Sequence, residues 1–387
     1  MPQTRKLRMG MVGGGRGAFI GAVHRMAATL DGRIELAAGA FSADPERSRL
    51  SGEDLLLPKG RVYGSYAEMI ERESARPSGE RIDFVAIVTP NHEHCPAARA
   101  ALLGGFPVMC DKPLALNLAE ARELRALVRK TGLLFGLTHN YSGYPMVKEA
   151  RHRVAAGELG RIRRVVAEYP QGWLSSALEA TGQKQAAWRT DPARAGASCC
   201  IGDIGTHAAH LAEYVTGLPI VAIASELTTF VPGRALDDDA SVLLRLGGGA
   251  RGVLWASQVA IDEENGLNLR VYGEKGSLQW RQEEPNTLLL KWPDRPREIL
   301  RTGTNYGRLS REALGATRLP AGHPEGYLEA FANLYKDFAS ALLEGGKPDV
   351  PTVDDGVRGM AFIEACVESS KASGRWTKLE GLEGGES

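Results

Sequence analysis

A glycine-rich segment near the N-terminus has the residues and the position of a phosphate-binding loop. It reads Met11-Val12-Gly13-Gly14-Gly15-Arg16-Gly17-Ala18-Phe19-Ile20-Gly21, after an expected strand and at the start of an expected helix. Glycines there allow a tight turn and let backbone N–H groups approach a pyrophosphate, whose charge the helix N-terminus stabilises. Gly13 and Gly15 fit the first two glycines of a dinucleotide-binding turn, and a side chain at Gly15 is expected to collide with the phosphates. For the third glycine, Ala18 stands at the regular spacing, whereas Gly21 requires a longer loop.

The end of the second expected strand bears on the choice between NAD and NADP. A carboxylate at this point normally accepts hydrogen bonds from the adenosine ribose, but Ser42 occupies the expected position. Ser42 with Arg47 could tolerate or favour the 2′-phosphate of NADP. Alternatively, Asp44, two residues after the expected position, could accept hydrogen bonds from the ribose of NAD. Asp44 equally suits an ordinary helix N-terminus. We expect NAD rather than NADP because Ala43, and not an arginine, follows Ser42 directly.

Asp203 and His207 form a candidate acid/base pair in the middle of the chain. They stand four residues apart at an expected helix start, so their side chains share one face and can act together. With His210 and the neighbouring Cys199 and Cys200 they could also be considered as metal ligands. Adjacent cysteines and a His-x-x-His pair lack the spacing of known zinc sites, so we expect no metal and treat the cysteines as small buried thiols.

Two kinds of sheet must position these groups. Short apolar runs alternate with helix-period segments over residues 1–139, which predicts an open parallel sheet with helices on both faces. Residues 140–387 begin with a helix and continue with several strands joined by short polar turns. The glycine-rich turns near residues 247 and 274 suit hairpins, so we expect an α+β domain with a large, mainly antiparallel open sheet. The expected fold is therefore α/β with two domains, divided at residue 139.

Composition narrows the class of protein. Lys+Arg and Asp+Glu both number 47 among 387 residues, and this balance gives no global field for binding nucleic acid or an acidic membrane. The five cysteines are too few, and odd in number, for a disulfide framework, which favours the cytoplasm. We find no apolar run of the ~18 residues that a membrane helix needs, and we expect no membrane association.

Three more segments complete a family resemblance. Cys110-Asp111-Lys112-Pro113 and Thr89-Pro90-Asn91-His92-Glu93-His94 each end an expected strand, and Gly202-Asp203-Ile204-Gly205-Thr206-His207 begins a helix. Together with the glycine loop, they resemble the Gfo/Idh/MocA family of NAD(P)-dependent sugar and cyclitol oxidoreductases. The resemblance implies a Rossmann domain, a C-terminal domain whose open sheet often forms an oligomer interface, and hydride transfer between nicotinamide and a ring carbon that bears a hydroxyl.

The resemblance also assigns roles to three catalytic candidates. Lys112 matches the lysine of the family's Glu-Lys-Pro motif, with Asp111 in place of the glutamate, and would hydrogen-bond the reacting hydroxyl. His207 matches the family's general acid/base, and Asp203 the aspartate that fixes or shares its proton and binds substrate. The motif's final aspartate is replaced by His210, which puts the contact made by that acid in doubt.

Further residues are expected to line the cofactor and substrate sites. The family match implies the following cofactor contacts in addition to Lys112: Gly13, Gly15, Phe19, Ile20, Ser42, Arg47, Thr89, Pro90, Asn91, His94 and Asn140. Beside Lys112, Asp203 and His207, the substrate candidates are polar or aromatic groups suited to a polyol, namely Tyr169, Trp188 and His323, with Gln171, Trp173 and Arg189 in the same loops.

These observations predict an NAD(P)-dependent dehydrogenase that acts on a cyclic polyol, sugar or glycoside, similar to inositol or glucoside dehydrogenases. Two alternatives stay open: a Rossmann-type nucleotide-binding or sensor protein without catalysis, and a reductase of a non-sugar substrate such as a dihydrodiol or a biliverdin-like compound. The strands near Ser241–Leu246 and Val253–Val259 alternate apolar and polar residues, which leaves one sheet face for a partner subunit. We therefore expect a homodimer or homotetramer.

Overall fold

The computed structural model describes residues 5–305 and 309–379. The chain forms two compact units. Unit 1 comprises Met1–Asn140 and Tyr327–Val357, and unit 2 comprises Tyr141–Gly326 and Arg358–Ser387. The chain thus passes from unit 1 to unit 2 one residue beyond the expected boundary, and it returns to unit 1 near its C-terminus. The expected division into two continuous segments did not include this return.

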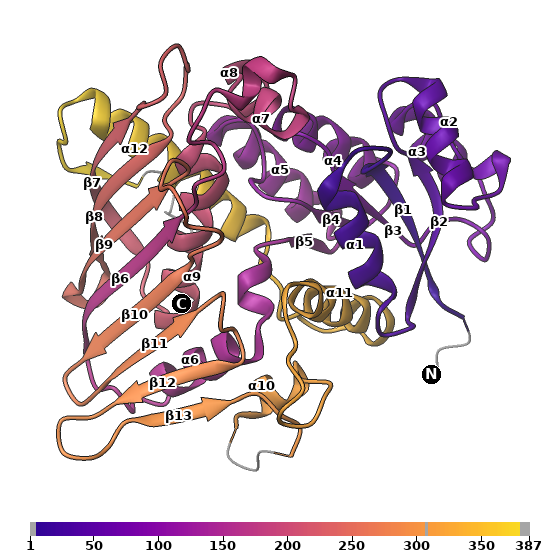
Figure 1. The fold of residues 1–387 in the computed structure, drawn as a ribbon. Helices are drawn as coiled ribbons and strands as arrows, with labels where there is room; N and C mark the ends of the chain where they lie inside the picture. The colour runs from indigo at the N-terminus through magenta and orange to yellow at the C-terminus, as the bar shows by residue number, and fades with distance from the viewer. Residues whose placement is uncertain (1–4, 306–308, 380–387) are drawn as a thin grey trace. The chain divides into compact units, whose positions relative to one another are not determined.

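Unit 1 is a parallel α/β domain (Figure 1). Its sheet has the order β2-β1-β3-β4-β5. The strands are β1 (Leu7–Gly13), β2 (Ile34–Ala40), β3 (Phe84–Val88), β4 (Val108–Cys110) and β5 (Phe135–Leu137). The helices are α1 (Phe19–Thr29), α2 (Pro45–Asp54), α3 (Tyr66–Ser74), α4 (His94–Leu103), α5 (Leu118–Thr131) and the returning α11 (Tyr327–Glu344). The strand order reverses at β1, so the carboxyl ends of β1 and β3 flank the crevice where open α/β sheets bind ligands.

The return of α11 completes the hydrophobic core of unit 1. Phe331, Tyr335 and Phe338 are buried in one cluster with residues of β1, β3 and α1. His24 of α1 contacts both Phe331 and Tyr335. Helix α1, which begins at the glycine loop, is therefore held by a segment about 300 residues away in sequence.

Unit 2 is built on a nine-stranded sheet with the order β13-β12-β11-β10-β6-β9-β8-β7-β14. All neighbouring pairs are antiparallel except β6 with β9. The strands are β6 (Ile162–Pro170), β7 (Ile220–Thr228), β8 (Asp239–Leu246), β9 (Arg251–Ser257), β10 (Asn268–Gly273), β11 (Ser277–Arg281), β12 (Thr287–Lys291), β13 (Glu298–Arg301) and β14 (Thr377–Lys378). The expected fold class, a parallel Rossmann sheet followed by a large and mainly antiparallel sheet, is confirmed.

Helices lie against one face of the second sheet (Figure 1). They are α6 (Pro145–Ala155), α9 (Thr206–Thr216) and α12 (Val353–Lys371), with the short α7 (Lys184–Arg189), α8 (Pro192–Ala195) and α10 (Arg311–Gly315) in connections. On the other face of β8 and β9, Leu243 is 51% exposed and pairs with the half-buried Val253, next to Trp255. Within the described ranges, no helix is both long and apolar enough to cross a membrane.

Candidate active site

The loop after β1 has the backbone that a phosphate-binding turn requires. Gly13 and Gly14 have φ angles of +82° and +73°, which only glycine adopts readily. Helix α1 begins after Ala18, and its first turn has neither a side-chain cap nor an acidic residue. Arg25 donates a 2.7 Å hydrogen bond to the carbonyl oxygen of Gly14 and holds the loop against the helix. An uncapped helix start directly after such a loop fits the pyrophosphate of a dinucleotide.

Two glycines are required by the packing of the protein itself. A Cβ atom at Gly21 would lie 2.3 Å from Gly14 Cα, so Gly21 provides the close helix–loop approach expected of the third glycine, and the longer spacing is the correct one. A Cβ atom at Gly15 would lie 2.6 Å from Ser51 Oγ and 2.8 Å from the carbonyl oxygen of Phe41. A side chain at Gly15 was expected to collide with the phosphates of a cofactor; it would first disturb the contact between the loop and the β2–α2 segment of the protein itself.

The two residues that open α1 have different surroundings. Ile20 packs against the core of unit 1, whereas Phe19 is 65% exposed beside the loop. Contact of either residue with the cofactor stays a prediction.

The segment after β2 is organised by Asp44. The Asp44 carboxylate accepts hydrogen bonds from the backbone N–H groups of Glu46 and Arg47, which makes it the N-cap of α2. The interpretation of Asp44 as an ordinary helix start is therefore correct. The Ser42 hydroxyl accepts a hydrogen bond from the Asp44 N–H group. Arg47 is exposed and donates to the carbonyl oxygen of Arg16, so its guanidinium lies over the glycine loop.

Lys112 lies in a turn that is tied to the end of β3. His94 is fully buried, with Nδ1 2.6 Å from the carbonyl oxygen of Pro113 and Nε2 2.9 Å from that of Thr89. Burial lowers the pKa of His94, against the opposing effects of Asp111 and of these carbonyl groups. Asp111 accepts hydrogen bonds from the Lys112 N–H group and from the Thr138 hydroxyl. His94 thus connects the two strand ends, and its expected contact with the cofactor stays a prediction.

The other cofactor candidates of unit 1 lie at the same end of the sheet. Thr89 and Pro90 directly follow β3 and are half-buried, and the buried Asn91 begins the next turn. Asn140 is buried at the last position of unit 1.

In unit 2, Asp203 lies in a π-helical turn rather than in the expected α-helix. The π-helical residues are Ile201–Gly205, and α9 begins with Thr206 and carries the buried His207. Asp237, itself buried, anchors the entry to this turn through the Ser198 hydroxyl and the backbone N–H groups of Cys199 and Ile201. π-Helical turns often occur at functional sites because they displace side chains from regular α-helical positions.

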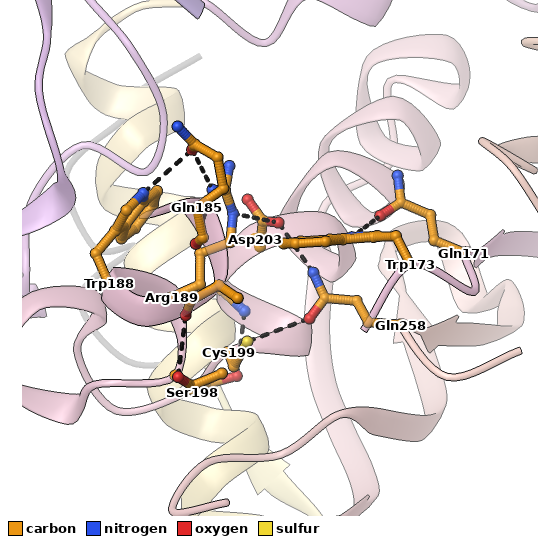
Figure 2. Close-up of polar contacts among 12 residues, drawn as sticks. Gln171, Trp173, Gln185, Trp188, Arg189, Ser198, Cys199, Asp203 and Gln258 are labelled. Carbon is orange, nitrogen blue, oxygen red and sulfur yellow. Dashed lines mark hydrogen bonds and ion pairs between the residues drawn. The ribbon is translucent and has the colours of Figure 1, made fainter. Parts of the chain in front are cut away.

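The Asp203 carboxylate is held by two partners from other segments (Figure 2). Oδ2 accepts hydrogen bonds from Arg189 Nε at 2.9 Å and from Gln258 Nε2 at 3.0 Å. Arg189 is itself fixed by Gln185 and stacks over the rings of Trp188 at 4.3 Å and Trp173 at 5.8 Å. We call Asp203, Arg189, Gln258, Trp188 and Trp173 the Asp203 cluster.

A second set of polar groups surrounds His207. The Tyr141 ring lies edge-on to His207 with a centroid distance of 4.8 Å, and its hydroxyl contacts that of Tyr169. Asn265 accepts hydrogen bonds from Tyr169 at 2.7 Å and from Gln171 at 2.9 Å. Trp173 donates to Gln171, which joins this set to the Asp203 cluster. Hydroxyl, amide and aromatic groups of this kind suit a hydroxyl-rich ligand.

Comparison with known proteins identifies the family. Residues 7–139 match the "Oxidoreductase family, NAD-binding Rossmann fold", and residues 147–279 match the "GFO/IDH/MocA C-terminal domain". An uncharacterized oxidoreductase of Bacillus subtilis is 34% identical over 97% of this chain and 98% of its own. The chain belongs to the Gfo/Idh/MocA oxidoreductase family. Its assignment as a dehydrogenase-type enzyme is thereby confirmed.

Solved structures of this oxidoreductase family include complexes with ligands. An inositol dehydrogenase homolog from Azotobacter vinelandii, complexed with NAD+, has a TM-score of 0.91 and 38% identity, covering 97% of this chain and 98% of that chain. Among curated relatives, levoglucosan dehydrogenase of Pseudarthrobacter phenanthrenivorans is 26% identical over 97% of this chain and 98% of its own.

Two of the histidines singled out in the sequence, His323 and His210, lie outside these sets. His323 is exposed on a turn, with Nδ1 3.2 Å from the carbonyl oxygen of Pro320, and the described contacts do not bring it to the Asp203 cluster. His210 stacks on Tyr214 at 5.9 Å, and Arg151 lies over the same ring at 4.4 Å. Among the described residues, no three His, Cys, Asp or Glu side chains gather as metal ligands.

Sequence reasoning missed Gln258 and Asn265 in the oxidoreductase, and it missed the pairing of Arg189 with Asp203. Gln258 directly follows the mostly apolar β9, and a glutamine at the end of an apolar run is a sequence signal that could have been noticed. In the structure this amide is fully buried. Asn265 follows a run of three acidic residues, Asp262 to Glu264, which reads as a solvated loop. The partners of both side chains are at least 50 residues away, so no local pattern indicates them.

Proposed function

We propose that this oxidoreductase oxidises a ring carbinol of a cyclic polyol, sugar or glycoside, with NAD as the hydride acceptor. The observation that carries the proposal is the buried His207 on α9, four residues after Asp203, with amide, hydroxyl and aromatic groups around the two residues. Relatives named inositol 2-dehydrogenase and levoglucosan dehydrogenase act on ligands of this chemical class.

NAD is the cofactor that unit 1 suits best. Gly13 and Gly14 with the start of α1 would hold its pyrophosphate. Ser42 and Arg47 would lie by the adenosine ribose, after the carboxyl end of β2. The Azotobacter vinelandii homolog is complexed with NAD+ and, in another structure, with NADH and myo-inositol. When bound, NAD supplies the acceptor for the hydride.

Three side chains divide the work at the substrate. His207 takes the proton of the reacting hydroxyl, Lys112 stabilises the developing alkoxide, and Asp203 orients His207 and binds a hydroxyl. Arg189 and Gln258 both donate to Asp203, so Oδ2 of this carboxylate acts as a hydrogen-bond acceptor in the site. Tyr169 contacts hydroxyls of the substrate ring, and Trp188 packs against its apolar face.

A substrate panel tests this proposal. Purified protein with NAD or NADP is offered inositols, hexoses and anhydrosugars, and reduced nicotinamide is followed by absorbance. We expect turnover with at least one cyclic polyol or sugar, and faster turnover with NAD than with NADP. Binding of NAD without turnover of any member, or turnover of dihydrodiols alone, would overturn the substrate assignment.

We also propose that the enzyme is a homodimer or homotetramer of the cytoplasm. The exposed apolar pair of Leu243 with Val253 beside Trp255 gives a partner subunit a face to cover. All five cysteines are free and buried, as suits a reducing compartment. Sedimentation should show an oligomer that Leu243→Glu dissociates; a wild-type monomer at micromolar concentration would exclude this assembly.

A further inference from the structure

One hydrogen-bond chain in unit 2 runs from the catalytic candidate Asp203 to a buried thiol (Figure 2). Gln258 Nε2 donates to Asp203 Oδ2 at 3.0 Å, and Cys199 Sγ donates to Gln258 Oε1 at 3.2 Å. The backbone N–H group of Asp203 donates to the carbonyl oxygen of Cys199 at 2.8 Å. Asp203 is therefore connected to Cys199 twice, once through the main chain and once through the Gln258 side chain.

The chemistry of the three groups fixes the direction of this chain. A carboxylate only accepts hydrogen bonds, so the amide must turn its NH2 group toward Asp203. The amide oxygen then points to Cys199, where a donor is required. Burial raises the pKa of the Cys199 thiol well above its ordinary value, so the thiol keeps the proton that it donates.

The surroundings leave the amide no other orientation. Gln258 is fully buried, and its backbone is held at both sides by hydrogen bonds with Asp238 and Leu174. Cys199 lies in a small apolar cluster with Leu174, Ala186, Ala195 and Leu236. If the thiol is removed, the amide oxygen is left without a donor, and the flipped amide would place that oxygen against the carboxylate.

We propose that Gln258 is a positioning residue for Asp203 and that Cys199 fixes the Gln258 amide in the orientation that holds the carboxylate. The inference rests on the proposed function, in which Asp203 orients His207.

The neighbouring Cys200 offers a matched control, because it is equally buried and loses the same atoms on substitution by alanine. Cys199→Ala should lower kcat about five- to tenfold, because a buried acceptor loses its donor. Cys199→Ser keeps a donor and Cys200→Ala leaves the chain intact, so both should stay within about twofold of wild type. The affinity for NAD, measured by calorimetry, should be the same in all four proteins. Equal kcat in Cys199→Ala and Cys200→Ala would overturn the proposal, as would a Cys199→Ser variant as slow as Cys199→Ala.

A second experiment needs no turnover and separates this inference from the proposed function. In a double-mutant cycle, the unfolding equilibrium constant is measured for each single variant and for the double variant. For Cys199→Ala with Gln258→Met, the double variant should differ by about three- to tenfold from the product of the two single effects. For Cys200→Ala with Gln258→Met, the single effects should simply combine. Coupling between Cys199 and Gln258 without oxidation of any polyol would refute the proposed substrate and leave the hydrogen-bond chain in place. Oxidation of a polyol without this coupling would refute the hydrogen-bond chain alone.

Discussion

The stability of unit 1 should depend on pH through His24. This side chain lies on α1, fully buried, with Nδ1 2.8 Å from the Tyr335 hydroxyl and its ring 4.9 Å from that of Phe331. Burial lowers the pKa of His24 to about 4, only partly opposed by the charge of Asp111. The histidine therefore stays neutral in the folded protein at every pH at which the enzyme is expected to work.

The sign and size of the effect follow from this pKa. An unfolded chain binds a proton at histidine near pH 6.5, whereas folded His24 does so only near pH 4. Between these values the unfolded state binds more protons, so the free energy of unfolding falls as the pH is lowered. The loss is about 1.4 kcal/mol for each pH unit, or roughly 2 kcal/mol at pH 5 compared with pH 7.5.

Hydrogen exchange of peptides from α1 and α11, measured at pH 7.5 and pH 5 and corrected for intrinsic rates, reports the stability of unit 1 by itself. The double variant His24→Leu with Tyr335→Phe removes the titrating group and its partner together. From pH 7.5 to pH 5, its free energy of unfolding should fall by about 2 kcal/mol less than that of wild type. Tyr335→Phe alone is the control in the same unit, because it keeps the buried His24 and should retain the pH dependence of wild type. An identical pH dependence in wild type and the double variant would refute the reasoning.

Three more predictions concern the site. Lys112→Ala and His207→Ala should each lower kcat by about 10²–10⁴ with little change in NAD affinity, and the rise of oxidation rate with pH should disappear in His207→Ala; near-normal turnover of that variant would move the proton to another group. Gly21→Ala should weaken NAD binding at least tenfold, because its Cβ would meet the glycine loop, whereas Gly60→Ala, with open space around it, should bind as wild type in calorimetry. Arg189→Gln should raise the KM for the polyol about tenfold or more through loss of a charge-assisted hydrogen bond, and an unchanged KM would exclude this role.

Unit 1 was largely predictable from sequence because its signals are local. The short apolar runs expected to form a parallel sheet over residues 1–139 correspond to β1 to β5, and the glycine loop follows the first of them. The return of residues 327–357 to this unit could not be predicted. An amphipathic helix shows that one of its faces is buried but not against which partner, and His24 and Tyr335 meet only in the folded chain.

The substrate side was predictable only in part. The spacing of Asp203 and His207 indicated one helix, but hydrophobic periodicity does not distinguish an α-helix from a π-helical turn of five residues. The carboxylate's partners come from α7 and from the end of β9, and neither segment carries a motif. Tyr169 and Trp188 were expected near the substrate from residue type alone, and their contacts with Asn265 and Arg189 could be known only from the fold.

This difference between the two units bears on how the substrate is chosen. Lys112, Asp203 and His207 match the family motifs, so the chemistry that we propose for them is one that relatives of different specificity can share. The side chains around Asp203 come from residues 171–189 and from the segment after β9. Neither segment carries a family motif. If the catalytic groups are common and their surroundings are not, specificity for one polyol over another must lie in these segments. Exchange of residues 171–189 with those of a relative should therefore change the preferred substrate while the pH dependence of oxidation is kept.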